Sequence, residues 1–364
     1  MAANEKRTVM ARMFEQKMKP TLFLASHATP QTTLASSIEI DIVRGLETFA
    51  VDIVPGAGGR GNKKTRYTTK EYTPPMYNEF YNITAEELMK RLPGQTKYDA
   101  ADSAFQATLL AIITDKQAMM QDKELRSIEL QARDAMFDGT ITLHNGDVID
   151  FKKKTTHTIS PTYKWNASTG VPLTDLEAAC ALCRKDGKIG ASRFKLVVAD
   201  DVVEALIANA QFIAKANIRH IENVQMGMPT DINADGATFH GVFSAGSYTI
   251  ELWAYPQFYT VPVGFGLANE GTMQPYIPSG KALLLPATGL RMDLWYAGIP
   301  QVVNQVDSVL AGMGLTGTIG MVEADFVPYA RLDDRSESIE AGVKTRPLFV
   351  PHQIDGLCSF DTLV

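Results

Sequence analysis

An uninterrupted helical segment constrains this chain more than any other feature. From Ser103 to Asp138 the sequence contains no glycine or proline, and its apolar residues recur near one face at helical spacing. These residues are Phe105, Leu109, Ile112, Met119, Ile128, Ala132 and Ala135. Ser103 and Gln106 form a capping box, and Gly139 is placed to end the helix. At about 1.5 Å per residue the segment spans about 54 Å, which predicts a strut across a domain.

A second segment lacks the apolar residues needed for a core of its own. Residues 55–75 contain four glycines and no large apolar side chains other than Tyr67 and Tyr72. Five of its residues are basic, namely Arg60, Lys63, Lys64, Arg66 and Lys70. Such a long and polar excursion is typical of segments that order against a partner. Because strand-like runs precede it, SSIEIDIVRG and ETFAVDIVPG, we predict a long projecting hairpin.

The rest of the chain predicts an α+β protein with two lobes. The run TITLHNGDVIDF places Asn145-Gly146 between two alternating segments, which predicts a tight hairpin with a type I′ turn. Residues 173–305 then predict a second lobe, with a helix ending at Gly187, a buried strand RFKLVVAD, a helix VVEALIANAQFIAKA and further strands. The closing residues are expected to return to a sheet of the first lobe. Residues 5–19 predict a short amphipathic arm that orders on assembly.

Composition excludes several classes of protein. Hydrophobic residues make up 45% of the chain and charged residues 21%, as in folded globular proteins. The net charge of -6 argues against a surface built to neutralise many phosphates. Three cysteines, Cys180, Cys183 and Cys358, cannot form a full disulfide framework. Neither a signal peptide nor a run of 18 apolar residues is present, so we expect no membrane insertion.

Glycine-rich motifs in the chain fail as nucleotide sites. Gly56, Gly58 and Gly61 satisfy the spacing G-x-G-x-x-G, but a dinucleotide fingerprint must open a helix, and the residues that follow favour a strand. A phosphate loop would require lysine at position 62, which is Asn62. We therefore expect no nucleotide cofactor.

Metal-binding patterns are also incomplete. Asp231, Asn233, Asp235 and Gly236 match the first half of a calcium loop, but position 12 of the loop would be Val242 instead of glutamate. An Asx-rich turn and an irregular calcium site remain as interpretations. Cys180 and Cys183 form C-x-x-C in a predicted helix, and zinc would need a second ligand pair that Cys358 and sequence-distant histidines do not supply. Buried packing is the interpretation we favour, with no metal, no cofactor and no catalytic residue assigned.

The order of these elements resembles a known family. The basic excursion is followed by TAEELMKRLPG, by the long helix ending QARDAMFDG, and by the hairpin TITLHNGDVIDF. The pattern continues through KLVVADDVVEALIANAQF and KALLLPATGLRMDLWYAG to RPLFVPHQIDGLCSFDTLV. Together they resemble the lambda-type phage major capsid proteins, the phage capsid protein E family, over nearly the whole chain.

The resemblance implies the Hong Kong 97-like capsid fold, with these parts along the chain. They are an N-terminal arm (1–20), a peripheral domain (21–50, 81–172 and 306–364) with a spine helix (103–138), an extended loop (51–80), and an axial domain (173–305). On that basis the five basic residues of the loop would contact an adjacent subunit.

The implied function is assembly. Copies would form the pentamers and hexamers of the icosahedral head of a tailed phage, built in the bacterial host cytoplasm around double-stranded DNA without sequence specificity. The implied partners are a separate scaffolding protein, a portal and, as a further candidate, a decoration protein. Two alternatives stay open, an encapsulin-like compartment shell of the same fold and a soluble α/β enzyme with an unrecognised site.

Overall fold

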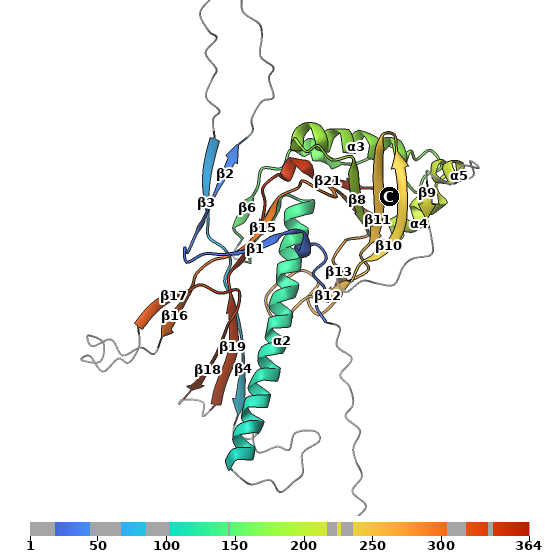
Figure 1. Cartoon of the computed structure of the whole chain (residues 1–364). Helices are drawn as coiled ribbons and strands as arrows, with labels where there is room; N and C mark the ends of the chain where they lie inside the picture. Colours follow the sequence, from blue (N-terminus) through green and yellow to red (C-terminus); the bar gives the residue numbers. More distant parts are fainter. Residues whose placement is uncertain are drawn as a thin grey trace, which may run out of the picture.

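A computed structural model describes most of the 364-residue chain (Figure 1). The described ranges are 19–43, 67–84, 102–144, 146–216, 224–226, 236–303, 318–333 and 338–363. The predicted arm therefore lies almost wholly outside the described residues, as do the strand ETFAVDIVPG and most of the extended loop.

The long helix predicted from sequence is present. Helix α2 spans Asp102–Phe137, which agrees with the predicted range of 103–138 to within one residue. It ends where the sequence predicts, because Gly139 adopts a φ of +72° that favours glycine. The second half of the helix packs into the core through Ile128, Ala132 and Met136, whereas Leu110 near its start is exposed. Figure 1 shows α2 leaving the body of the molecule as a strut.

A three-stranded antiparallel sheet runs beside the projecting half of α2 (Figure 1). Its strands, in spatial order, are β18 (Val327–Asp333), β19 (Ser338–Thr345) and β4 (Tyr77–Thr84). The side chain of Gln117 donates to the carbonyl of Tyr329 at 3.1 Å, and the ammonium of Lys116 lies 4.2 Å from the ring centroid of Tyr81. These pairings join the C-terminal section to β4, and its assignment to the peripheral domain stays a prediction.

The largest sheet has seven strands and mixed direction. In spatial order they are β7 (Thr158–Ile159), β21 (Cys358–Asp361), β14 (Lys281–Pro286), β8 (Arg193–Val198), β11 (Tyr248–Ala254), β10 (Thr238–Ala245) and β9 (Val224–Met226). Consecutive residues are buried in the central strands, as in Leu196–Val198 and Leu283–Leu285, which is typical of a sheet covered on both faces. Helix α3 (Pro172–Gly187) lies along this sheet (Figure 1).

The last strand lies in the seven-stranded sheet between β14, from the predicted axial domain, and β7, from the predicted peripheral domain. Strand β21 pairs antiparallel with β14, with Lys281 opposite Asp361 and Leu284 opposite Cys358. The pairing continues where the N–H of Thr362 donates to the carbonyl of Gly280 at 2.7 Å. A short apolar strand carries no sequence signal for its partners, which are β14 on one side and β7 on the other.

The prediction of a single helix over VVEALIANAQFIAKA is wrong, because this segment forms two helices. Helix α4 (Asp200–Ala208) ends at Asn209, whose backbone is extended, and α5 (Ala210–Ala216) follows. The amide of Asn209 donates to the carbonyls of Trp165 at 3.2 Å and Gly170 at 3.1 Å. Its oxygen accepts from the N–H of Gln211 at 2.9 Å. These tertiary bonds stabilise a break that asparagine tolerates well.

The hairpin predicted at 140–151 forms with a wider turn than expected. Strands β5 (Thr140–Thr142) and β6 (Val148–Asp150) pair so that Thr142 lies opposite Val148. The N–H of Gly146 donates to the carbonyl of Leu143 at 2.9 Å, and the φ of Gly146 is +87°. The prediction of a two-residue type I′ turn is therefore wrong.

Smaller elements complete the fold. A three-stranded sheet contains β1 (Thr29–Thr32), β15 (Met292–Tyr296) and β20 (Pro347–Pro351). Three further two-stranded pairs are β2 (Ile38–Val43) with β3 (Tyr67–Tyr72), β12 (Phe258–Thr260) with β13 (Met273–Pro275), and β16 (Ile299–Val303) with β17 (Thr318–Val322). Short 3₁₀ helices are η1 (Ala25–His27), η2 (Thr155–His157) and η4 (Ile354–Gly356).

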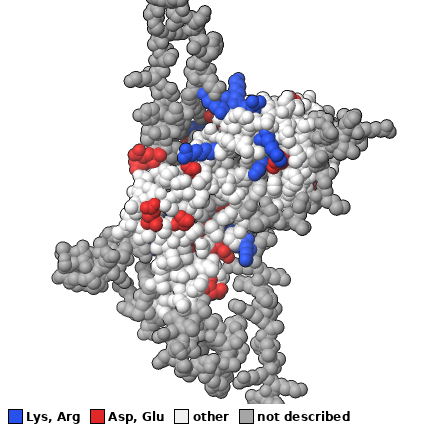
Figure 2. Space-filling view, viewed as in Figure 1, with Lys and Arg blue, Asp and Glu red and all other residues white. Residues whose placement is uncertain are grey.

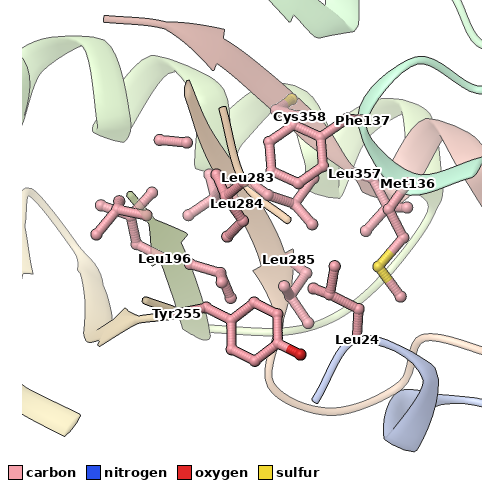
Figure 3. Packing of buried hydrophobic residues seen from close by; sticks show 14 of the residues in the cluster. Leu24, Met136, Phe137, Leu196, Tyr255, Leu283, Leu284, Leu285, Leu357 and Cys358 are labelled. Carbon is pink, nitrogen blue, oxygen red and sulfur yellow. The ribbon is translucent and has the colours of Figure 1, made fainter. Parts of the chain in front are cut away.

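One continuous core joins the two predicted lobes. Figure 3 shows Leu24 from the N-terminal segment, Met136 from α2, Leu285 from β14 and Leu357 near the C-terminus in a single cluster. The division into peripheral and axial domains stays a prediction, since burial does not separate them. Within the described ranges, no helix combines the length and apolarity needed to cross a bilayer.

Candidate functional site

The predicted contact residues of the extended loop fall mostly beyond what the structure describes. Arg60, Lys63, Lys64 and Arg66 lie outside the described residues. Lys70 lies in β3, where its backbone is opposite Ile40 of β2, and its side chain is outside the described part. The two strands pair from Ile38 opposite Tyr72 onward, so the base of the predicted hairpin is present. Figure 1 shows this ribbon projecting from the body.

A different exposed surface was missed from sequence, the loop between β12 and β13, which we call the apolar loop (residues 261–272). Within it Val263 is 70% exposed and Phe265 56%, and the neighbouring Met273 of β13 is 68% exposed. Leu267 and Phe258 are exposed as well. Large apolar side chains that gather on a surface mark a contact with another molecule more often than a free surface.

One carboxylate organises the apolar loop. Glu270 accepts hydrogen bonds from the backbone N–H groups of Gly264 at 3.0 Å, Phe265 at 2.9 Å and Leu267 at 3.0 Å. These N–H groups, that of Gly264 first, hold the pKa of Glu270 below its usual range. Because the loop backbone is bonded to its own acid, Phe265 and its apolar neighbours are displayed in a fixed arrangement. The sequence signal was the alternation of apolar residues with glycine in VPVGFGLANEG.

The strands below the apolar loop are attached to the strut helix. The guanidinium of Arg133 in α2 donates to the hydroxyl of Tyr259 in β12 at 3.3 Å. The ring of Tyr259 lies 5.2 Å from that of Tyr276, which lies 5.7 Å from that of Tyr255 in the core. These contacts join the apolar loop to α2 through Tyr259 and to the core through Tyr276 and Tyr255.

Charge is unevenly distributed on the face drawn in Figure 2. Lys and Arg side chains gather in the upper part of the described surface, whereas Asp and Glu side chains lie mainly to the left and below. A surface on which acidic and basic side chains lie apart can pair with the opposite charges of a second copy. Such pairing favours one relative position of the two copies over others.

The remaining sequence motifs divide between undescribed and buried positions. Gly56, Gly58 and Gly61 lie outside the described residues, and so do Asp231, Asn233 and Asp235, so neither the nucleotide nor the calcium interpretation is tested. Cys180 and Cys183 are fully buried in α3, as predicted.

The argument that Cys358 and the histidines are too distant to join the C-x-x-C cysteines is wrong. The Sγ atoms of Cys183 and Cys358 lie 3.1 Å apart, and Cys358 Sγ lies 3.4 Å from Nδ1 of His157. Sequence separation hid this cluster, because η2, α3 and β21 are far apart along the chain and contact one another only once it has folded.

Comparison with known proteins gives one family match. A model of the family described as phage major capsid protein E matches residues 7–362. No match was found among curated proteins.

Solved structures show a similar fold. A protein described as the capsid protein of a prophage of Escherichia coli CFT073 is 15% identical, with a TM-score of 0.58 over 96% of this chain and 94% of that chain. The capsid of cyanophage P-SCSP1u is 13% identical, with a TM-score of 0.49 over 98% and 91%. The SrpI encapsulin of Synechococcus elongatus PCC 7942 is 12% identical, with a TM-score of 0.44 over 99% and 92%. The last two likenesses are too weak to support an argument.

Proposed function

This chain belongs to the phage major capsid protein E family, and on that premise we propose how its copies assemble. The family makes it a structural subunit of the phage head in the virion, with the Hong Kong 97-like fold expected from sequence. We propose that its copies form pentamers and hexamers that close into an icosahedral shell around double-stranded DNA, and that it has no catalytic role. The observation that supports this mode of assembly is the apolar loop. Its large apolar side chains would stay exposed to water in a free subunit and would be covered by contact with another copy.

We propose that a second copy of the chain binds the exposed surface of the apolar loop. A stable protein interface buries about 1,600 Å² in total with an apolar centre and a polar rim. The exposed side chains of Val263, Phe265 and Met273 supply such a centre. Since the hairpin is bonded to α2 through Arg133 and Tyr259, contact at the loop would fix the tilt of one strut against the next subunit.

The extended loop supplies a second contact in this proposal. Its five basic residues, Arg60, Lys63, Lys64, Arg66 and Lys70, would meet acidic surface on an adjacent copy. The separation of acidic from basic side chains on the face in Figure 2 supports this pairing. Charged pairs at the rim of an interface set register and association rate more than affinity.

Further partners follow from the same assembly. A separate scaffolding protein would guide curvature, a portal would occupy one vertex, and a decoration protein is a further candidate on the outer face. The net charge of -6 suits a wall that holds packaged DNA without binding its sequence. Assembly would take place in the cytoplasm of the bacterial host.

Electron microscopy of the expressed protein, with and without its scaffold, tests the proposal. We expect capsomers or closed particles in at least one condition. Persistent monomers under both conditions, together with catalytic turnover, would overturn it in favour of an enzyme. A compartment shell would also form particles, so the genes beside this one decide that alternative, with portal, protease and terminase genes expected for a phage head.

Two variants test the assigned surfaces. Deletion of residues 57–66 should leave a folded subunit with a lower particle yield. Phe265→Ser should do the same, whereas Ile207→Ser, which alters an equally exposed apolar residue on α4, serves as the matched control. An unchanged yield for either of the first two variants would contradict the corresponding assignment.

A further inference from the structure

Three side chains from distant parts of the sequence bring nitrogen and sulfur donors together inside the fold. His157 comes from η2, Cys183 from α3 and Cys358 from β21. One donor atom from each lies within 4.8 Å of the other two. All three side chains are fully buried, with 0% exposure. Imidazole and thiolate are the ligands that zinc prefers in structural sites.

The spacing of the donors is close to that of a metal site. Zn–S bonds of about 2.3 Å and Zn–N bonds of about 2.0 Å in tetrahedral geometry place two sulfurs about 3.8 Å apart, and sulfur and nitrogen about 3.5 Å apart. Cys358 Sγ and His157 Nδ1 are separated by 3.4 Å. The two sulfurs are separated by 3.1 Å, so they would move apart by about 0.7 Å to accept the ion.

The imidazole of His157 already has the outer partner that a zinc-bound histidine requires. Its Nε2 lies 3.1 Å from Oδ2 of Asp186, and the ammonium of Lys154 holds the same oxygen at 2.9 Å. A carboxylate that accepts from one ring nitrogen fixes the tautomer and leaves the other nitrogen to the metal. Here that other nitrogen is Nδ1, which lies 3.4 Å from Cys358 Sγ and 3.1 Å from the carbonyl oxygen of Leu357, so the bond to the ion would replace its hydrogen bond to that carbonyl.

A candidate for the fourth ligand lies one helical turn from Cys183, outside the group of three whose donor atoms lie within 4.8 Å of one another. Cys180 precedes Cys183 by three residues in α3, which places both on the same face of the helix, and it too is fully buried. Three cysteines and one histidine make a closed structural set. Three thiolates and Zn²⁺ leave a net charge of -1, and the partly buried ammonium of Lys153 is close enough to offset it, since it donates to Ser359 Oγ, next to Cys358, at 2.9 Å.

We propose that His157, Cys183 and Cys358 bind a zinc ion, with Cys180 as the fourth ligand after a change of its side-chain rotamer. The ion would link η2, α3 and the C-terminal strand β21. It would thereby hold the last strand in the seven-stranded sheet. A disulfide between Cys183 and Cys358 is the competing outcome, and it would leave Cys180 and the His157–Asp186 pair without a role.

Cobalt substitution of the reduced full chain tests the proposal independently of shell assembly. Co²⁺ bound by thiolates in tetrahedral geometry gives intense charge-transfer and ligand-field absorption. We expect this spectrum to saturate at one Co²⁺ per chain and to be lost on addition of Zn²⁺, with metal analysis showing one zinc per chain after expression in zinc-supplemented medium. This measurement uses the unmodified protein, so it does not depend on any variant folding.

Variants identify the ligands. Cys358→Ser and His157→Gln should lower Zn²⁺ affinity by more than tenfold, and Asp186→Asn by about 10-fold to 100-fold as the loss of a positioning residue. His144→Gln, an exposed histidine elsewhere, is the control and should bind normally. Cys180→Ser should weaken the charge-transfer absorption, and an unchanged spectrum would remove Cys180 from the ligand set.

Two results would overturn the proposal. One is a reduced chain with three titratable thiols that shows no thiolate absorption with excess Co²⁺ and carries no zinc. The other is peptide mapping of the protein as isolated from zinc-supplemented medium that finds Cys183 joined to Cys358.

Discussion

The carboxylate of Glu129 in α2 accepts a hydrogen bond from the backbone N–H of Leu24 at 2.8 Å. Its second oxygen accepts from the N–H of Ala25 at 2.9 Å. Glu129 is fully buried, so the strut helix uses a charged side chain to bind the first turn of η1. Charge-assisted bonds of this kind are stronger than neutral ones, and a buried donor left unpaired is costly.

Replacement of Glu129 should therefore destabilise the subunit. Glu129→Ala removes both acceptors and leaves two buried N–H groups, and we expect a loss of about 2–4 kcal/mol in the free energy of unfolding. Chemical denaturation at fixed protein concentration measures this loss. Glu204→Gln, which changes an exposed acid in α4, should stay within about 0.5 kcal/mol of the wild type. Equal stability of both variants would contradict the anchoring role.

Glu124 makes stability depend on pH. Its side chain is 1% exposed, and neither carboxylate oxygen has a hydrogen-bond partner among the described residues. Burial first, and then the charge of Glu79, raises the pKa of Glu124 to about 8. Because the folded pKa lies above the unfolded one, the folded state binds more protons, and stability falls as pH rises from about 4.5 to about 8.

Glu124→Gln should remove this dependence. Gln resembles the protonated acid, so the variant and the wild type should have similar stability at pH 5. At pH 9 the variant should be the more stable, by no more than about 5 kcal/mol. Denaturation curves at both pH values measure the difference. A constant difference between the two proteins across this range would show that Glu124 titrates normally.

The end of α3 approaches η4 too closely for a side chain at Gly187. A Cβ atom there would lie 2.5 Å from Cα of Gly356 and 2.8 Å from its nitrogen. Gly187→Ala should therefore cost about 1–3 kcal/mol, although alanine is the better helix former by about 1 kcal/mol. Gly190→Ala is the matched control, because its Cβ would meet no atom within 4 Å. Thermal unfolding compares the two variants. Equal midpoints would show that Gly356 moves away from the added methyl group at little cost in stability.

Glu270 should matter for assembly more than for folding. Glu270→Ala removes the acceptor for the N–H groups of Gly264, Phe265 and Leu267, while the loop stays exposed to water. We expect the unfolding midpoint of the subunit to change little and the particle yield to fall, as measured by light scattering during assembly. A large loss of subunit stability with normal assembly of the folded fraction would reverse this interpretation.

Local sequence determined the elements that depend on local forces. The long helix α2 follows from the absence of glycine and proline between Ser103 and Asp138, and its end follows from Gly139. Strands β8, β10, β11 and β14 follow from apolar runs between turn residues. The family resemblance, which rests on the order of such elements, is confirmed over residues 7–362.

Tertiary contacts decided what spacing along the chain cannot encode. Asn209 breaks a helix of favourable composition because Trp165 and Gly170 offer it carbonyl acceptors. Strand β21 lies between β14 and β7 in the sheet, and its parallel pairing with β7, with Ser359 opposite Thr158, brings Cys358 next to His157. Helix propensity acts within a turn and can be read from neighbours, whereas strand partners and side-chain clusters depend on which distant surfaces the whole fold brings into contact.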